Sequence, residues 1–94
     1  MEMKRILVFC RHGADVESFF EELSSSMKVQ GINKSKKSFC TEYEVFEFIN
    51  INSRGADGLK AHDFLLSPCL LKTGGIDLIE QAVNLGRSYT AIYP

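Results

Sequence analysis

The sequence predicts a single α/β domain built around a parallel sheet. Short apolar segments rich in β-branched and aromatic residues recur along the chain, and segments with helical periodicity lie between them. A content of 45% hydrophobic and 24% charged residues is ordinary for a globular domain, and 94 residues are enough for one modest core. We therefore expect one domain over residues 1–94.

The first strand is predicted over residues 4–10 (KRILVFC), an apolar run suited to burial on both faces. A helix is predicted over residues 15–29, because apolar residues recur there at helical spacing. Asp15 is a suitable N-cap for this helix, and Gly31 lies just beyond its expected end. The polar, lysine-rich residues 30–42 are predicted to form a loop.

Two further strands are expected in the second half of the chain. Residues 43–51 (YEVFEFINI) form a β-prone segment, and residues 63–67 form a short apolar segment that ends before Pro68. Glycine-rich turn chemistry follows the first of these segments, and a short helix is predicted over residues 56–61.

The chain is expected to end in a helix and a strand. Residues 76–85 (IDLIEQAVNL) predict the helix, with Gly86 at its end, and residues 88–93 (SYTAIY) predict a fourth strand. Strands that alternate with helices imply right-handed crossovers and a four-stranded parallel sheet. Ligands of such sheets bind beyond the carboxyl ends of the strands. The loops after the first and third strands are therefore the candidate site.

Cys10 is the candidate reactive residue because it ends the first strand shortly before a helix begins. Backbone N–H groups of residues 11–16 are expected to surround an anion at the positive end of that helix. The same field, together with Arg11 and His12, favours the thiolate, which is a phosphoryl acceptor. The alternative is that Cys10 fills space at the end of a buried strand, as free cysteines commonly do.

Several short segments resemble one known family. Residues 4–13 (KRILVFCRHG) are an apolar strand ending in a cysteine, with a glycine three residues later. Residues 43–66 continue with a strand, an Asn-Ser-Arg-Gly-Ala-Asp-Gly segment and a strand that ends in Ser-Pro. In this order and spacing the chain resembles the lactose/cellobiose-type IIB proteins of the sugar phosphotransferase system. The resemblance covers most of the chain except about residues 28–42.

The resemblance implies a flavodoxin-like three-layer sandwich with a four-stranded parallel sheet in the order 2-1-3-4. It implies that Cys10 accepts a phosphoryl group from a histidine of a IIA protein and passes it to a sugar bound by a IIC membrane transporter. It also implies that the loop holds the phosphate through its backbone, at Arg11, His12, Gly13, Ala14, Asp15 and Val16. In that strand order, the pocket wall beside Cys10 is formed by Ser67, Pro68 and Cys69.

A second function stays open. Asp15 and Glu17 place carboxylates in the loop that is expected to bind a phosphate dianion, which they oppose by repulsion. Their presence favours a IIB-like regulatory or interaction domain that has kept the fold and lost phosphoryl transfer.

Composition bears on other classes of protein. A net charge of -1 argues against nucleic-acid binding. The three cysteines are an odd number without CxxC spacing, which argues against a disulfide scaffold and a structural zinc site. We expect neither a metal nor a cofactor. No apolar run approaches the roughly 20 residues that span a bilayer. The expected location is therefore the cytoplasm. The resemblance implies peripheral membrane contact there through a transporter partner.

Overall fold

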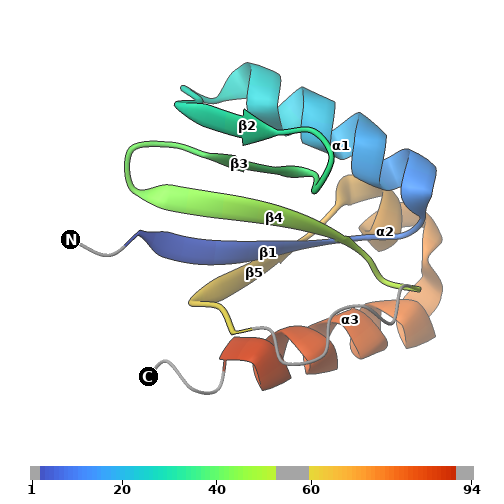
Figure 1. Cartoon of the computed structure of the whole chain (residues 1–94). Helices are drawn as coiled ribbons and strands as arrows, with labels where there is room; N and C mark the ends of the chain where they lie inside the picture. Colours follow the sequence, from blue (N-terminus) through green and yellow to red (C-terminus); the bar gives the residue numbers. More distant parts are fainter. Residues whose placement is uncertain (1–2, 53–59, 91–94) are drawn as a thin grey trace.

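The computed structural model describes residues 3–52 and 60–90, which form one sheet with helices on both faces (Figure 1). The elements, in chain order, are β1 (Lys4–Cys10), α1 (Gly13–Ser26), β2 (Gly31–Asn33), β3 (Ser38–Cys40), β4 (Glu44–Asn50), β5 (Asp63–Leu66), α2 (Pro68–Thr73) and α3 (Gly75–Thr90).

The sheet has five strands in the order β2-β3-β4-β1-β5. The central strand β1 pairs in parallel with β4 on one side and with β5 on the other. The strands β2 and β3 form an antiparallel hairpin, and β3 also pairs antiparallel with β4. The sheet is therefore mixed, with a parallel centre and an antiparallel extension at one edge.

Alternate residues of β1 point to opposite faces of the sheet and enter two separate cores. Ile6 and Val8 lie in the core under α1, where aromatic side chains dominate. Within that core, Phe20 of α1 packs edge to face on Phe48, with ring centroids 5.3 Å apart. Leu7 and Phe9 face the other side, where α2 and α3 cover them (Figure 1). Burying each of these large side chains contributes about 2 kcal/mol.

The expected all-parallel, four-stranded sheet in the order 2-1-3-4 is wrong. The strands expected at residues 4–10, 43–51 and 63–67 are present as β1, β4 and β5, with β1 in the middle. No described strand lies beyond β5, and the sheet is extended at its opposite edge by the β2–β3 hairpin. The three parallel strands were readable from their apolar segments, whereas the antiparallel β2–β3 hairpin at the other edge was not.

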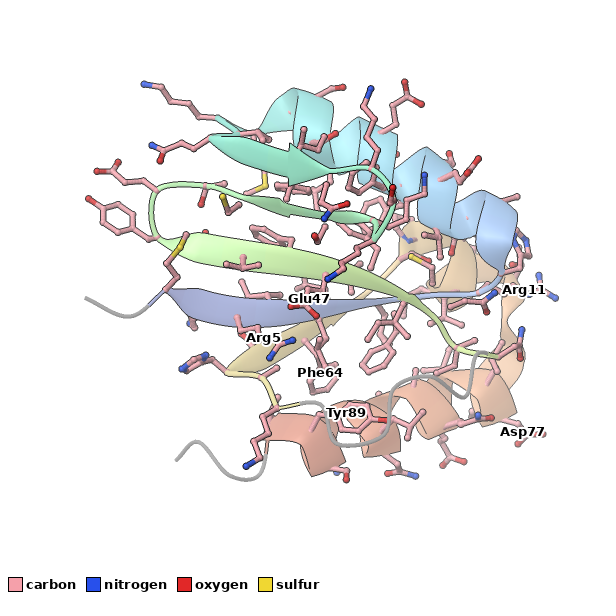
Figure 2. The ribbon with its side chains drawn as sticks, in the orientation of Figure 1. Arg5, Arg11, Glu47, Phe64, Asp77 and Tyr89 are labelled. Atoms are coloured by element: carbon pink, nitrogen blue, oxygen red, sulfur yellow. The ribbon has the colours of Figure 1, made fainter. Side chains whose placement is uncertain are left out.

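The strand expected at residues 88–93 is wrong, because α3 continues through Gly86 to Thr90; residues 91–93 lie outside the described part of the chain. Gly86 lies inside the helix, and its missing side chain allows α3 to pack closely on the sheet. A Cβ atom at Gly86 would come within 2.5 Å of the Phe64 ring. One turn later, Tyr89 stacks on Phe9, with ring centroids 6.3 Å apart. Figure 2 shows Tyr89 on α3, on the same side of the sheet as Phe64 of β5. Packing on the sheet therefore overrides the local β propensity.

The loop expected at residues 30–42 is also wrong, because this segment contains the β2–β3 hairpin. Its strands have three residues each, which is too short for an alternating pattern to stand out. Phe39 supplies the apolar anchor, since it is buried and stacks on Phe46, with centroids 5.0 Å apart. The lysines occupy the turn between the strands, where Lys37 adopts a positive φ of 53°.

The remaining expectations differ in their bounds. The helix expected over residues 15–29 begins earlier, as α1, and the helix expected over residues 76–85 is longer at its C-terminal end, as α3. The short helix α2 was not expected, although Ser67-Pro68 is a typical N-cap and first-turn pair. The helix expected over residues 56–61 lies largely outside the described residues. Among the described helices, none has both the length and the apolar character needed to span a membrane.

Candidate functional site

Cys10 lies at the carboxyl end of β1, between the two neighbouring parallel strands. It pairs with Asn50 of β4, and its carbonyl oxygen accepts a hydrogen bond from the Ile51 N–H (2.8 Å). Its residue exposure is 0%, and its side chain belongs to the core under α1. A reagent in solvent therefore has no direct path to the sulfur in the folded state.

Side chains at the start of α1 accept hydrogen bonds from the free backbone N–H groups there. His12 is the N-cap, and its Nδ1 accepts a hydrogen bond from the Asp15 N–H (3.1 Å). In return, Asp15 Oδ2 accepts a hydrogen bond from the Arg11 N–H (2.8 Å). This reciprocal arrangement resembles a capping box, with histidine in the place usually taken by serine or threonine. Asp15, expected to be the N-cap, is instead the residue that reaches back.

Asp15 also connects α1 to α2. Only 6% of Asp15 is exposed, and the Ser67 hydroxyl donates a hydrogen bond to Asp15 Oδ2 (2.5 Å). Ser67 is the N-cap of α2, where its Oγ accepts a hydrogen bond from the Leu70 N–H (3.1 Å). A buried carboxylate is costly unless it is hydrogen-bonded, and here two donors satisfy it. One carboxylate oxygen therefore joins the ends of β1 and β5 to the starts of both helices.

These surroundings keep Cys10 in its thiol form. Burial, followed by the electrostatic effects of Asp15 and Cys69, raises the pKa of Cys10 from 9.0 to about 12, against the opposing effect of the polar Ser67 side chain. The expectation that the helix start, Arg11 and His12 favour the thiolate is therefore wrong. The nearby carboxylate and the removal of the sulfur from water outweigh the field of the helix.

The structure places the six residues expected to bind phosphate in different roles. The N–H groups of Arg11, Asp15 and Val16 already donate within the chain, the last of them to the His12 carbonyl (3.0 Å). Gly13 lies exposed in the first turn of α1 together with Ala14. A Cβ at Gly13 would meet nothing within 4 Å, so the backbone there makes no close approach that requires glycine.

Figure 2 shows Arg11 at the carboxyl end of β1, beside the start of α1. The Arg11 carbonyl oxygen accepts a hydrogen bond from Asn52 Nδ2 (2.9 Å), which ties the end of β1 to the residues that follow β4. Asn52 was not a candidate in the sequence, and only its place in turn-forming residues pointed to it.

The three residues expected to wall a pocket beside Cys10 form the start of α2, directly after β5. Ser67 is fully buried, Pro68 is the first residue of α2, and Cys69 follows at intermediate exposure. Cys69 Sγ lies 3.5 Å from Thr73 Oγ1, within its own helix. Cys10, Cys40 and Cys69 are all free thiols.

The second acidic residue of the loop, Glu17, points away from Cys10. It is exposed and forms an ion pair with Lys37 of the hairpin (3.4 Å). The two carboxylates therefore differ, because Asp15 lies in the candidate site and Glu17 on the outer face of α1. Within residues 3–52 and 60–90, no group of three or more His, Cys, Asp or Glu side chains is placed to hold a metal ion.

The fold and the site define a small α/β protein with a mixed sheet, in which a buried carboxylate occupies the position beside the strand-end cysteine. No protein-family model matches the chain, and neither does any curated protein or solved structure.

Proposed function

We propose that the chain is a IIB-like interaction domain in which Cys10 is a core residue and phosphoryl transfer has been lost. The carrying observation is the buried Asp15 carboxylate, which accepts hydrogen bonds from the Arg11 amide and the Ser67 hydroxyl. An incoming phosphate would need such donors at the end of β1. It would have to displace the carboxylate or bind next to a like charge.

The state of Cys10 supports the same proposal. A phosphoryl acceptor of this kind reacts as the thiolate and must meet the donor group in line. Cys10 is 0% exposed, and its pKa is raised to about 12. Burial and the raised pKa both disfavour the thiolate at neutral pH.

Phosphoryl-carrier function is the second candidate, and one specific observation favours it. Cys10 still ends the central parallel strand directly before a helix, where the resemblance to IIB proteins places the acceptor. In that case the donor is a IIA histidine, and the acceptor is a sugar bound by a IIC transporter. Both candidates place the chain in the cytoplasm, in contact with components of a sugar-uptake system.

Incubation of the full chain with a phosphorylated IIA protein of the lactose/cellobiose type separates the two candidates. Intact mass spectrometry is expected to show no phosphoryl adduct, while a functional IIB protein in the same reaction acquires one. An acid-labile adduct that is lost in Cys10→Ser and kept in Cys40→Ser would overturn the proposal in favour of the carrier.

Binding is measured separately from transfer. Titration calorimetry with the unphosphorylated IIA protein is expected to give the same dissociation constant for the wild type and for Cys10→Ala, because the buried sulfur makes no surface contact. The absence of both transfer and IIA binding would contradict the interaction domain proposed here.

A further inference from the structure

Residues of α1 and of the β2–β3 hairpin line a groove. Both elements lie on the side of the molecule away from α3 (Figure 1). Its volume is about 350 Å³. The α1 wall is made by residues three and four positions apart, which share one face of a helix. The residues that matter for binding are Glu17, Phe20 and Glu21 on α1, and Ile32, Lys34 and Lys37 on the hairpin.

The groove has an exposed apolar residue at its open side. Ile32 is 49% exposed, although it pairs with the buried Phe39 across the hairpin. It belongs to β2, the terminal strand of the sheet, and no described strand pairs with the outer edge of β2. An exposed edge strand with an apolar side chain is a site at which another chain can add.

The two walls of the groove carry opposite charges. Glu17 and Glu21 lie on α1, and Lys34 and Lys37 lie on the hairpin. Glu17 and Lys37 form an ion pair across the groove (3.4 Å), and Lys37 Nζ also lies 5.6 Å from the centroid of the Phe20 ring. Within the described part of the chain, Glu21 and Lys34 have no ion-pair partner.

We propose that this groove binds the same groove of a second copy of the chain, forming a two-fold symmetric dimer. In such an interface one surface must complement itself. A two-fold axis that runs along the groove brings the acidic wall of one copy opposite the basic wall of the other, so that Glu21 meets the partner's Lys34 twice. Ile32, on the hairpin wall of each copy, then packs against the α1 wall of the other copy.

The balance of charge argues for this occupant. A nucleic acid or an anionic membrane surface would favour Lys34 and be repelled by Glu21, whereas a copy of the groove satisfies both residues. The dimer does not depend on the state of Cys10 and therefore goes beyond the proposed function.

Sedimentation velocity on the full chain, over a series of protein concentrations, tests the proposal. The wild type is expected to form a dimer whose dissociation constant rises with salt, because its charge pairs lie at a solvated interface. Glu21→Lys and Lys34→Glu are each expected to raise the dissociation constant roughly tenfold or more. Each variant alone sets like charges against each other, and an equal mixture of the two is expected to restore the dimer as a heterodimer.

Control variants outside the groove test whether the interface lies at the groove. Glu22→Lys makes the same change of charge on α1 outside the groove, and Leu65→Ser removes an exposed apolar residue from the opposite edge strand. Both are expected to dimerise like the wild type, whereas Ile32→Ser is expected to be monomeric. A wild type that is monomeric throughout, a mixture that stays monomeric, or an equal effect of Glu21→Lys and Glu22→Lys would overturn the proposal.

Discussion

Charged side chains are buried and hydrogen-bonded at the carboxyl edge of β1, whereas they are exposed in the groove beside α1. At the edge, the Asp15 carboxylate is buried and accepts hydrogen bonds from the Arg11 amide and the Ser67 hydroxyl. In the groove, Glu21 and Lys34 are exposed, and the described residues offer them no ion-pair partner. The carboxyl edge, where a parallel sheet usually binds ligands, is therefore occupied here by hydrogen bonds that stabilise the fold. The surface with unpaired charge lies elsewhere.

The largest effect is expected from removing the buried carboxylate. Asp15→Ala leaves the Arg11 N–H and the Ser67 hydroxyl without their acceptor, and hydrogen bonds to a charged group contribute about 1.5–3 kcal/mol each. We expect the free energy of unfolding in urea to fall by about 3 kcal/mol. Glu17→Ala, on the outer face of the same helix, is the control and is expected to change it by less than about 0.5 kcal/mol. Equal, small effects of both substitutions would remove the distinction between the two regions.

A pH effect of intermediate size is expected from Cys10. Its pKa is raised in the folded state, so the folded protein binds the proton more tightly than the unfolded chain does. The resulting stability is fully present below pH 9 and is lost as pH rises toward 12. Near pH 10.5 the loss is expected to reach about 2 kcal/mol, at about 1.4 kcal/mol per pH unit.

Urea unfolding of the wild type and of Cys10→Ala, compared at several pH values, isolates this contribution from that of lysines and tyrosines. We expect the wild type to lose stability more steeply than the variant above pH 9. Parallel profiles for the two proteins would show that the Cys10 thiol titrates normally and that its surroundings are open to water.

The smallest effect is expected at Gly13. A Cβ added there meets nothing within 4 Å, so Gly13→Ala is expected to change the free energy of unfolding by no more than about 1 kcal/mol, in the stabilising direction. Gly86→Ala is the contrasting variant, because its Cβ would lie within 2.5 Å of the Phe64 ring, and it is expected to cost about 2 kcal/mol. Thermal unfolding measures both. A strongly destabilised Gly13→Ala would indicate a tight loop that requires glycine.

The sequence predicts the parallel centre of the fold because β1 and β4 are long enough for their apolar character to stand above the background. It does not predict the hairpin, whose anchor Phe39 is a single residue in a polar segment. It also misleads at Gly86, where a glycine read as a helix end is needed for close packing on Phe64. Local patterns give propensities, and these two positions are decided by contacts distant in sequence.

The candidate site, too, has one part that the sequence predicts and one part that depends on contacts distant in sequence. Cys10 and Ser67 were placed at one edge of the sheet from the parallel arrangement of their strands, and they do lie there. The role of Asp15 was not readable, because aspartate is favoured at a helix start by its effect on the helix alone, and the donors that allow its burial come from the fold. Its partner Ser67 lies 52 positions away, and only the folded chain brings them together.

The accessibility of Cys10 tests most directly whether this edge is framework or active site. Iodoacetamide is added to the native protein at neutral pH, and peptide mass spectrometry follows alkylation at each cysteine with time. We predict that Cys40 and Cys69, which are partly exposed, react first, and that Cys10 reacts only under conditions that unfold the chain. Alkylation of Cys10 in the native protein ahead of the other two cysteines would contradict this and would identify it as an activated nucleophile.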